Sequence, residues 1–392
     1  MSIRTSVYKN ETKKNYDITD DRRDEYRRVS QEAREVKKAA ENGELVAVHP
    51  INRPTFNPSD LMPKLPDNGL RCLSMFSGGG GLDLGFDQAG YTHIASYELI
   101  PICKETLKNN RPNWKVFAGL DEGDVTTVDW SKYKNSVDII HGGPPCQPFS
   151  IAGEQKGNMD ERNMWGEFNR AVNAIQPKAF VAENVMGLIS PKFEPFVKKY
   201  ILDELSDYEI HRFEMNSANF GVPQIRRRVF FVGLRKSLGG LNKFQVPSHT
   251  HKWGKQKTEQ DDFFYPPEGK KKSVIGVRKA LGLSDIGFDN LAPTLRSGFT
   301  GKRNTTSVLN SSAGQEAWGA LRVWANGVQI SRQKASEYPA KHNHFRMSVQ
   351  DVGLLQGFPE DWKFAGAVYQ VLGQIGNFIK ETCLLLACLV DM

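Results

Sequence analysis

The feature that most constrains the fold is an alternation of short apolar runs with helical stretches, which begins at Leu70. Several helical segments, such as ICKETLKNN and FEPFVKKYILDEL, separate runs that have the length and composition of strands. The strand-like runs are LRCLSMF, HIASYE, VDIIHG, AFVAENV, EIHRFEMN and RRVFFVGLR. This alternation predicts an α/β domain with a mainly parallel sheet, whose strand ends are open to a ligand.

The pattern divides the chain into four segments. Residues 1–69 form a helical N-terminal extension, in which a charged helix is followed by a proline-rich linker or strap, HPINRPTFNPSDLMPKLPDNG. Residues 70–240 hold the sheet domain. In residues 241–345 the rhythm gives way to a smaller, basic, breaker-rich domain, and residues 346–392 return to the first domain through SVQDVGLLQGFPEDW and an apolar helix around FIKETCLLLACLV.

The positive charge is concentrated in one part of the chain. The net charge is +7, but residues 235–345 carry +10 and the remainder −3. A local excess of this kind is expected where one segment lies along a phosphate backbone, and a solvated surface with a chance imbalance is the alternative.

Cysteine spacing and hydropathy limit which cellular compartments and which kinds of site fit the sequence. The five cysteines form no C-x-x-C pair and have no zinc-ligand spacing, so we expect neither a disulfide framework nor a metal site. The N-terminus lacks the apolar core of a signal peptide, and no long apolar run occurs. The sequence therefore predicts a cytoplasmic protein without a membrane partner.

The first strand-like run ends in a glycine turn, LSMFSGGGGLDLGF, that opens a helix. Such a turn lets a ligand approach the backbone closely, and Glu98 at the end of the next run can accept hydrogen bonds from ribose hydroxyls. Together they favour an adenosine-containing cofactor over a simple tight turn. The spacing is not G-x-G-x-x-G, which disfavours a nicotinamide-dependent oxidoreductase. Asp124 in GDVT either meets the adenine edge at a third strand end or only makes a turn.

The stretch HGGPPCQPFS frames Cys146 with glycines and prolines directly after a strand. Because proline fixes φ and biases the preceding residue toward an extended shape, the loop is stiff and aims the sulfur at the strand end. Inert packing is the usual role of a cysteine, but this frame favours a nucleophile.

Two further blocks supply an acid and two cations. Glu183 ends AFVAENV, on the same rim as the glycine turn, where partial desolvation raises a carboxyl pKa toward neutrality. Arg226 and Arg228 in PQIRRRVFFVG are two apart and share one face of a strand. They either bind an anionic or carbonyl partner or form a surface ion pair.

Five separated blocks, taken together, resemble the DNA (cytosine-5)-methyltransferase family of restriction-modification systems. They are FSGGGGLDLGF with Glu98, GGPPCQPFS, ENV, QIRRR and GQIGNFI, and their order and spacing match over about residues 70–235 and 345–392. The Pro-Cys-Gln block is highly specific, whereas the glycine turn alone is weak. The block near Ser348 departs from the family's Leu-Thr-x-Arg-Glu and reads Ser-Val-Gln-Asp, a difference that bears on packing rather than chemistry.

The resemblance implies a Rossmann-like, S-adenosylmethionine-dependent enzyme acting on a cytosine that swings out of duplex DNA. By similarity Cys146 attacks carbon 6, Glu183 binds N3 and the exocyclic amine, and Arg228 holds the base carbonyl. Arg226 supports the site or a phosphate. The residues that look like the cofactor shell are Phe76, Gly79, Gly81, Glu98, Leu99, Asp124, Val125, Gly143, Pro145 and Asn377.

The same resemblance identifies residues 241–345 as a target-recognition domain and SIAGEQKGNMDERNMW as a loop that closes over DNA. Candidate DNA contacts are Arg162, Arg296, Lys302, Arg303, Thr305 and Thr306. It implies a monomer on DNA, with a separate cognate restriction nuclease as a possible partner. The N-terminal extension is not covered, and a clamp, a dimer contact and a regulatory arm remain open for it.

Two other functions remain as alternatives. An RNA (cytosine-5)-methyltransferase of the same family shares the catalytic blocks but has a differently patterned recognition region. A noncatalytic DNA-binding regulator explains the basic segment but gives no reason to retain Cys146, Glu183 and Arg228 together.

Overall fold

A computed structural model describes most of the chain between Asn52 and Gly376. The described residues are 49–61, 63–145, 164–240, 244–254, 271–295, 306–309, 311–338 and 344–376, with Asp24, Arg28, Gln31, Glu35, Ala39 and Asn42. Of the extension's predicted helix, the described positions Asp24, Arg28, Gln31, Glu35 and Ala39 are helical. The predicted terminal helix around FIKETCLLLACLV lies outside the described residues.

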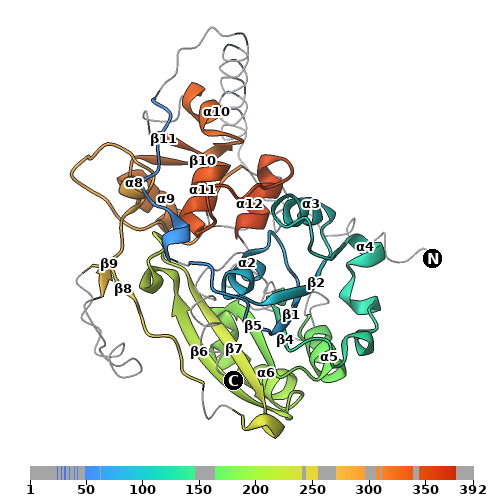
Figure 1. Ribbon diagram of the computed structural model, residues 1–392. Coiled ribbons are helices and arrows are strands. Elements are labelled where there is room, and N and C mark those ends of the chain that lie inside the picture. The colour runs from blue at the N-terminus through green and yellow to red at the C-terminus, as the bar shows by residue number, and fades with distance from the viewer. Residues whose placement is uncertain are drawn as a thin grey trace. The chain divides into compact units, whose positions relative to one another are not determined.

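A central sheet of seven strands confirms the predicted α/β class (Figure 1). The spatial order is β3-β2-β1-β4-β5-β7-β6. All pairings are parallel except those of β7, which runs antiparallel to both β5 and β6. The strands are β1 (Arg71–Met75), β2 (Thr92–Glu98), β3 (Val116–Ala118), β4 (Ile139–Gly142), β5 (Ala179–Val185), β6 (Tyr208–Asn216) and β7 (Arg227–Arg235).

Alternate side chains of the strands enter two different cores, as the period of a strand requires. Leu73, Ile140 and Phe231 pack in the cluster that contains α5. Their neighbours Cys72 and Ile139, with Phe230 and Val232, pack against Phe86 and Ala89 at the end of α2. The helices beside the sheet are α2 (Gly81–Gln88), α3 (Pro101–Asn110), α4 (Gly119–Glu122), α5 (Trp165–Ile175) and α6 (Glu194–Val197).

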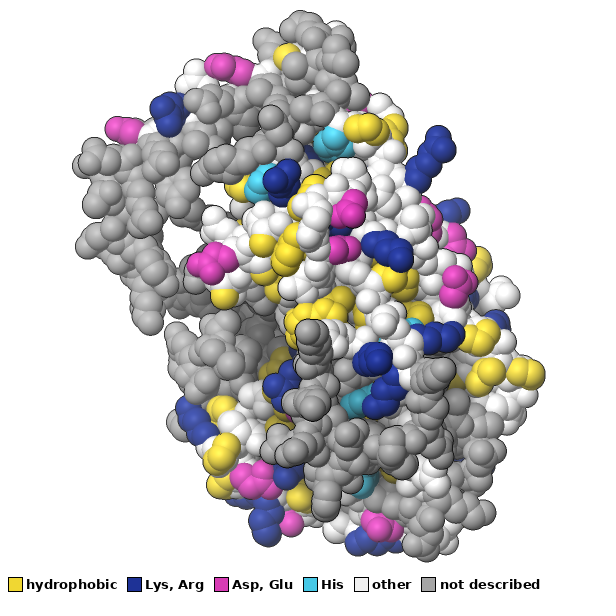
Figure 2. Space-filling view, turned by 90° about the vertical axis from the view of Figure 1, so that its left-hand side faces the viewer, with side chains coloured by type: hydrophobic (Ala, Val, Ile, Leu, Met, Phe, Trp, Pro, Cys, Tyr) yellow, Lys and Arg dark blue, Asp and Glu magenta, His cyan; other side chains and the backbone are white. Residues whose placement is uncertain are grey.

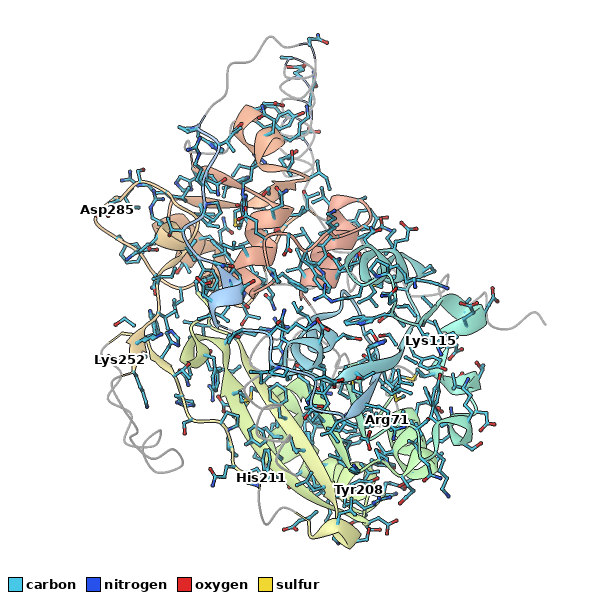
Figure 3. All side chains as sticks on the ribbon, in the orientation of Figure 1. Arg71, Lys115, Tyr208, His211, Lys252 and Asp285 are labelled. Carbon is cyan, nitrogen blue, oxygen red and sulfur yellow. The ribbon has the colours of Figure 1, made fainter. Side chains whose placement is uncertain are left out.

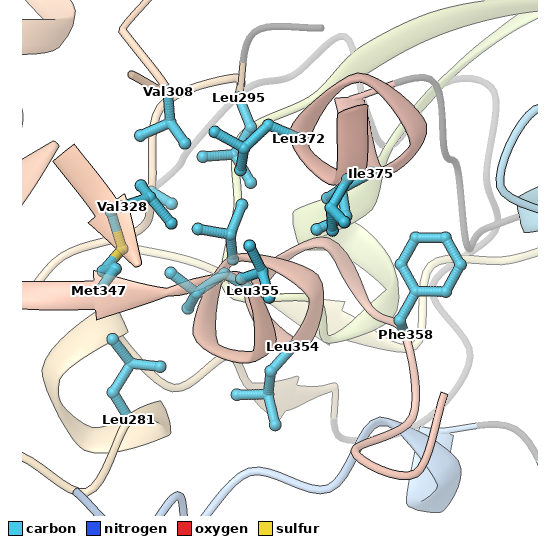
Figure 4. Close-up of a cluster of buried hydrophobic side chains, with 14 of the residues drawn as sticks. Leu281, Leu295, Val308, Val328, Met347, Leu354, Leu355, Phe358, Leu372 and Ile375 are labelled. Atoms are coloured by element: carbon cyan, nitrogen blue, oxygen red, sulfur yellow. The ribbon is translucent and has the colours of Figure 1, made fainter. Parts of the chain in front are cut away.

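A third core joins the short elements that follow the sheet to Leu84 of α2, Leu107 of α3 and Val116 of β3. Figure 4 shows Leu281, Leu355 and Ile375 among its members, and Phe56 from the N-terminal extension joins the same cluster. The elements here are β8 (His251–Lys252), β9 (Lys272–Ser273), α8 (Val277–Ala280), α9 (Ser312–Ala320), β10 (Val323–Gln329), α10 (Arg332–Glu337), β11 (Phe345–Ser348), α11 (Val349–Gln356) and α12 (Val368–Gly376).

The chain divides into two compact units. Residues 51–335 and 340–392 form one unit, and residues 1–50 with 336–339 form another. The proline-rich stretch after residue 50 therefore packs with the sheet-containing unit. The four-segment division stays a prediction.

The departure near Ser348 leaves the local packing regular. Ser348 caps α11, with its hydroxyl accepting from the Asp351 N–H, while the Asp351 carboxylate accepts from the Ser348 N–H at 2.8 Å and hydroxyl at 2.7 Å. Serine and aspartate thus form a complete capping box.

Candidate active site

The candidate site lies at the carboxyl ends of the parallel strands, where Glu98, Gly142 and Val185 end β2, β4 and β5. The opposite edge of the sheet is marked in Figure 3 by Arg71 and Tyr208, at the starts of β1 and β6. Ligands of open α/β sheets bind outside the carboxyl ends.

The glycine turn after β1 is shaped for close approach. Phe76 adopts φ 59 and Gly80 φ 85, so the chain turns through the left-handed region immediately before α2. A Cβ on Gly79 would lie 2.9 Å from the Cβ of Gln374 on α12, so no larger residue fits. Gly81 begins α2 and is buried. The turn therefore places glycine backbone, without side chains, at the carboxyl ends of the parallel strands.

Glu98 is held beside this turn. Its carboxylate accepts from the Gly78 N–H at 2.7 Å and from the Ile100 N–H at 3.0 Å. Burial raises the pKa of Glu98, and the backbone N–H groups of Ile100 and Gly78 oppose the rise. The acid is fixed in place and only 8% exposed.

The remaining described shell residues flank Glu98 or the Pro-Pro-Cys loop. Leu99 is 46% exposed, which leaves its apolar side chain open to a flat ligand. Asp124 accepts from the Thr126 N–H at 3.0 Å and caps a 3-10 turn that begins at the buried Val125. Asp124 therefore makes the turn, and whether it also contacts the adenine edge stays a prediction.

Glu183 and Arg228 form a buried ion pair across neighbouring antiparallel strands. The Arg228 Nε lies 2.8 Å from the Glu183 Oε1, and the two side chains are 13% and 11% exposed. Burial raises the pKa of Glu183, while the guanidinium groups of Arg228 and Arg226 counteract it. The pKa of Glu183 is therefore raised by burial, and the two guanidinium groups limit the rise.

The loop that leads into Cys146 is fastened to the same strand. The Asn184 amide donates to the carbonyl of Pro144 at 3.2 Å, and a Cβ on Gly143 would lie 3.0 Å from the Glu183 Oε2. Gly143 and Pro145 are partly buried. The acid therefore adjoins the loop whose next residue is Cys146.

Arg226 is 2% exposed and donates to the carbonyl of Gly376 at 2.7 Å. This contact ties the start of β7 to the end of α12, one residue before Asn377.

Of the predicted DNA contacts only Thr306 is described, and it is exposed. Seven predicted site residues lie outside the described residues: Cys146, Arg162, Arg296, Lys302, Arg303, Thr305 and Asn377.

The family assignment rests on sequence over most of the chain. The sequence model of the family described as C-5 cytosine-specific DNA methylase matches residues 70–380. The chain belongs to this family. It is thus a DNA (cytosine-5)-methyltransferase of restriction-modification type, and members of the family generally depend on S-adenosylmethionine.

Individual relatives agree with the assignment. The type II methyltransferase M.NgoMIV of Neisseria gonorrhoeae is 31% identical over 313 residues, which cover 78% of this chain and 91% of the relative. M.PspPI of Psychrobacter is 30% identical over 345 residues, covering 83% and 80%. The Dnmt2 methyltransferase structure of S. pombe superposes with a TM-score of 0.52 at 17% identity, over 82% of this chain and 98% of that one, and shows the fold alone.

Sequence reasoning missed one bonded cluster in this methyltransferase. The Thr106 hydroxyl on α3 donates to the Gln374 Oε1 at 2.6 Å and accepts from the Ala365 N–H at 2.8 Å, and the Gln374 amide donates to the Ala365 carbonyl at 2.9 Å. These bonds hold α12 close to Gly79. Gln374 stands within the recognised GQIGNFI block, but nothing in the sequence marks Thr106.

The side of the molecule in Figure 2, seen from the left of Figure 1, carries both basic and acidic side chains. Lys252 in β8 and Lys272 in β9 are exposed. Within the described ranges no group of three or more acidic, histidine or cysteine side chains is placed to hold a metal ion. Nor does any helix described there have the length and apolarity of a membrane span.

Proposed function

We propose that this methyltransferase moves the methyl group of S-adenosylmethionine to carbon 5 of a cytosine in a specific duplex DNA sequence. A transient bond between Cys146 and the flipped base makes the transfer possible. The observation that carries the proposal is the buried Glu183–Arg228 pair at 2.8 Å, beside the Gly-Pro-Pro run that leads into Cys146. The likeness to type II methyltransferases supports a further role, in which methylation protects DNA from a cognate restriction nuclease.

The chemistry explains why a thiol, an acid and a guanidinium are needed together. Carbon 5 of neutral cytosine is a poor nucleophile, so the Cys146 thiolate adds to carbon 6 and lends the ring an electron pair. Glu183 binds N3 and the exocyclic amine, and its raised pKa favours a shared proton at N3. Arg228 holds the base carbonyl and the Glu183 carboxylate in one geometry.

The last steps restore the ring. S-adenosylmethionine, when bound, supplies an electrophilic methyl group at carbon 5. A base then removes the carbon 5 proton, the electron pair returns to the ring, and the sulfur of Cys146 leaves as thiolate. Flipping the cytosine into the pocket excludes water from the reacting atoms and places carbon 6 near the sulfur.

The residues at the rim fit the cofactor. Bare backbone at Gly79, where a Cβ would collide with Gln374, accommodates close approach, and the fixed Glu98 carboxylate can accept ribose hydroxyls. Phe76, Gly81, Leu99, Asp124, Val125, Gly143, Pro145 and Asn377 complete the proposed shell.

We further propose that residues 70–240 and 241–345 act as catalytic and target-recognition domains, with residues 346–392 completing the first. The local positive charge of residues 235–345 supports DNA contact there. Contacts are assigned to Arg162, Arg296, Lys302, Arg303, Thr305 and Thr306. The enzyme would act as a monomer on DNA in the cytoplasm.

Bisulfite sequencing of a plasmid from cells that express the protein tests the proposal. The expected result is one protected cytosine position within a short recurrent sequence, and its loss in the Cys146→Ser variant. Methylation that persists in that variant would reject the covalent route. An unmodified plasmid, together with methylated cellular RNA, would favour the RNA-modifying alternative.

A further inference from the structure

Residues 51–61, here called the strap, precede the part of the chain that matches the family. The strap ends in a 3-10 turn, Pro58–Leu61, and is drawn in blue in Figure 1. Asn52 and Phe56 are each 8% exposed, and Phe56 packs in the core that also contains Ala280 and Leu281. A segment outside the family match therefore contributes to a core within it.

Asn52 connects two elements that are far apart in the sequence. Its amide donates to the carbonyl of Leu281 at 3.1 Å and to the Asp351 Oδ1 at 2.9 Å. Asp351 is fully buried, and its Oδ1 also accepts from the Arg332 Nε at 2.9 Å. Asn52 thus joins the residue that follows α8 to a buried carboxylate of α11.

The strap backbone caps the carboxyl end of α8. The N–H groups of Thr55 and Phe56 both donate to the carbonyl of Ala280, at 3.0 and 3.3 Å, and the Thr55 hydroxyl donates to the carbonyl of Lys279 at 2.6 Å. Carbonyls at the end of a helix lack intrahelical partners, so these bonds satisfy groups that otherwise need water. A Cβ on Gly282 would lie 1.8 Å from the carbonyl oxygen of Arg53, which shows how closely the strap lies.

The other end of α8 is bonded to the segment before the predicted DNA contacts. The Asp289 carboxylate accepts from the N–H groups of Arg278 and Lys279, each at 2.9 Å. The Val277 N–H donates to the carbonyl of Asn290 at 2.8 Å. The position of α8 therefore sets the position of residues 289–290.

That segment is in turn bonded to the chain leading into the arginine strand β7. The Ala292 N–H donates to the Pro223 carbonyl at 2.9 Å, and the Ile225 N–H donates to the Ala292 carbonyl at 2.8 Å. The Thr294 hydroxyl donates to the Ile225 carbonyl at 2.8 Å. Hydrogen bonds and short stretches of chain thus run from the strap to the residues that flank both the DNA-contact stretch and Arg226.

We propose that Asn52 is a positioning residue for DNA recognition. By fixing α8 against α11, it holds residues 289–294, which precede the predicted DNA contacts, beside the chain that leads into β7, in the geometry that binds the target duplex. The inference rests on the proposed function and assigns this role to the strap part of the N-terminal extension. Asn52 is not among the residues proposed above for the cofactor shell or for catalysis.

The test compares full-length Asn52→Ala with Asn57→Ala, a matched control in the same strap. Asn57 is exposed, its amide N–H donates to the Asp60 Oδ1 at 2.8 Å, and its Oδ1 accepts from the Ser59 N–H at 3.1 Å, so both bonds stay within the strap. In Asn52→Ala we expect the KM for the cognate duplex to rise about ten-fold, because a hydrogen bond to a charged partner is lost. Discrimination against a single-mismatch site should also fall, while kcat at saturating DNA and the KM for S-adenosylmethionine stay within about two-fold.

A purely structural role gives a different result. It lowers the melting temperature and the active fraction and leaves both KM values unchanged, and that outcome overturns the proposal. If Asn52→Ala does not fold, Thr55→Val removes only the bond to Lys279 and should raise the KM for DNA in the same direction. An unchanged KM in folded Thr55→Val also overturns it. Fluorescence anisotropy measures binding of the same duplex in parallel. If the wild type binds this DNA but does not methylate it, the proposed function is rejected. If the wild type and Asn52→Ala bind it with equal affinity, the role of Asn52 is rejected.

Discussion

The rim of the sheet and the recognition-side core, which is the third core described above and contains residues of α8 and α11, hold their buried charges in different ways. At the rim, Glu183 and Arg228 meet because β7 lies antiparallel beside β5. In the recognition-side core, Asp351 is bonded to Asn52, which is 299 residues away in the chain, and to Arg332. The first arrangement follows from the order of regular strands, whereas the second depends on irregular segments that meet only in the folded chain.

The largest expected effect breaks the rim pair. Glu183→Gln removes the titratable carboxyl and the charge opposite Arg228, so we expect kcat to fall by about 10³-fold, the scale of losing one preorganised transition-state contact. Steady-state kinetics with the cognate duplex, together with a thermal melt, separates this loss from unfolding.

The neighbouring residue of β7 provides the control. Arg227 donates to the Glu214 carboxylate at 2.7 Å, but the two side chains are 58% and 34% exposed. Since exposed pairs contribute about 1 kcal/mol or less, Glu214→Gln should keep near wild-type kcat. Equal losses in the two variants would contradict a special role for the rim pair.

The next expected effect comes from a difference in how the two regions satisfy the hydrogen bonds of their buried polar groups. Both carboxylate oxygens of Asp351 are hydrogen bonded, whereas in the described part of the chain neither ring nitrogen of His141 has a partner. His141 lies in β4, stacked on Phe86 at 3.9 Å, and burial lowers its pKa to about 4, partly offset by Asp83 and reinforced by His93. The folded chain therefore binds its proton more weakly than the unfolded chain does.

Stability should fall with acid for this reason. The contribution of neutral His141 is fully present above about pH 6.5 and is lost as the pH falls toward 4, with an upper limit of about 3 kcal/mol. Urea unfolding of wild type and His141→Phe at pH 8 and pH 5 measures it. The variant should lose less stability between the two pH values, and identical losses would show that His141 does not carry this dependence.

The smallest effect lies where the two regions meet. Thr106→Val keeps the shape of the side chain but removes the bonds to Gln374 and Ala365, so α12 and the adjoining Asn377 should be held less firmly. The KM for S-adenosylmethionine should rise about five-fold, with kcat little changed. Thr92→Val, at an exposed position at the start of β2, is the control. A KM for the cofactor equal to that of the control would remove Thr106 from cofactor binding.

The rim was largely predictable because its strands are apolar runs bounded by turn residues. Six strand-like runs correspond to β1, β2, β4, β5, β6 and β7. β3 was missed because Val116–Ala118 is three residues long and pairs only with β2. The predicted helix FEPFVKKYILDEL becomes α6 followed by a π turn at Lys198–Leu202, a change of hydrogen-bond register that periodicity does not reveal.

Contacts across the chain were much less predictable. Glu183 and Arg228 were both identified, yet their pairing requires β7 to lie between β5 and β6, against chain order. The proline-rich stretch was identified as a linker or strap, but its bond from Asn52 to Asp351 has no local signature. Sequence periodicity reports which face of an element is buried, not what that face meets.

The central claim is the covalent bond between Cys146 and the target cytosine, and a mechanism-based trap measures it directly. A duplex carrying 5-fluorocytosine at the target position is incubated with the protein and S-adenosylmethionine, then denatured and separated by mass. We expect a stable one-to-one adduct, mapped to Cys146 by peptide mass spectrometry and absent from Cys146→Ser, because fluorine cannot leave as a proton does. The covalent mechanism is contradicted if the protein methylates the unfluorinated control duplex but forms no adduct with the fluorinated duplex. An adduct on a residue other than Cys146 would also contradict it.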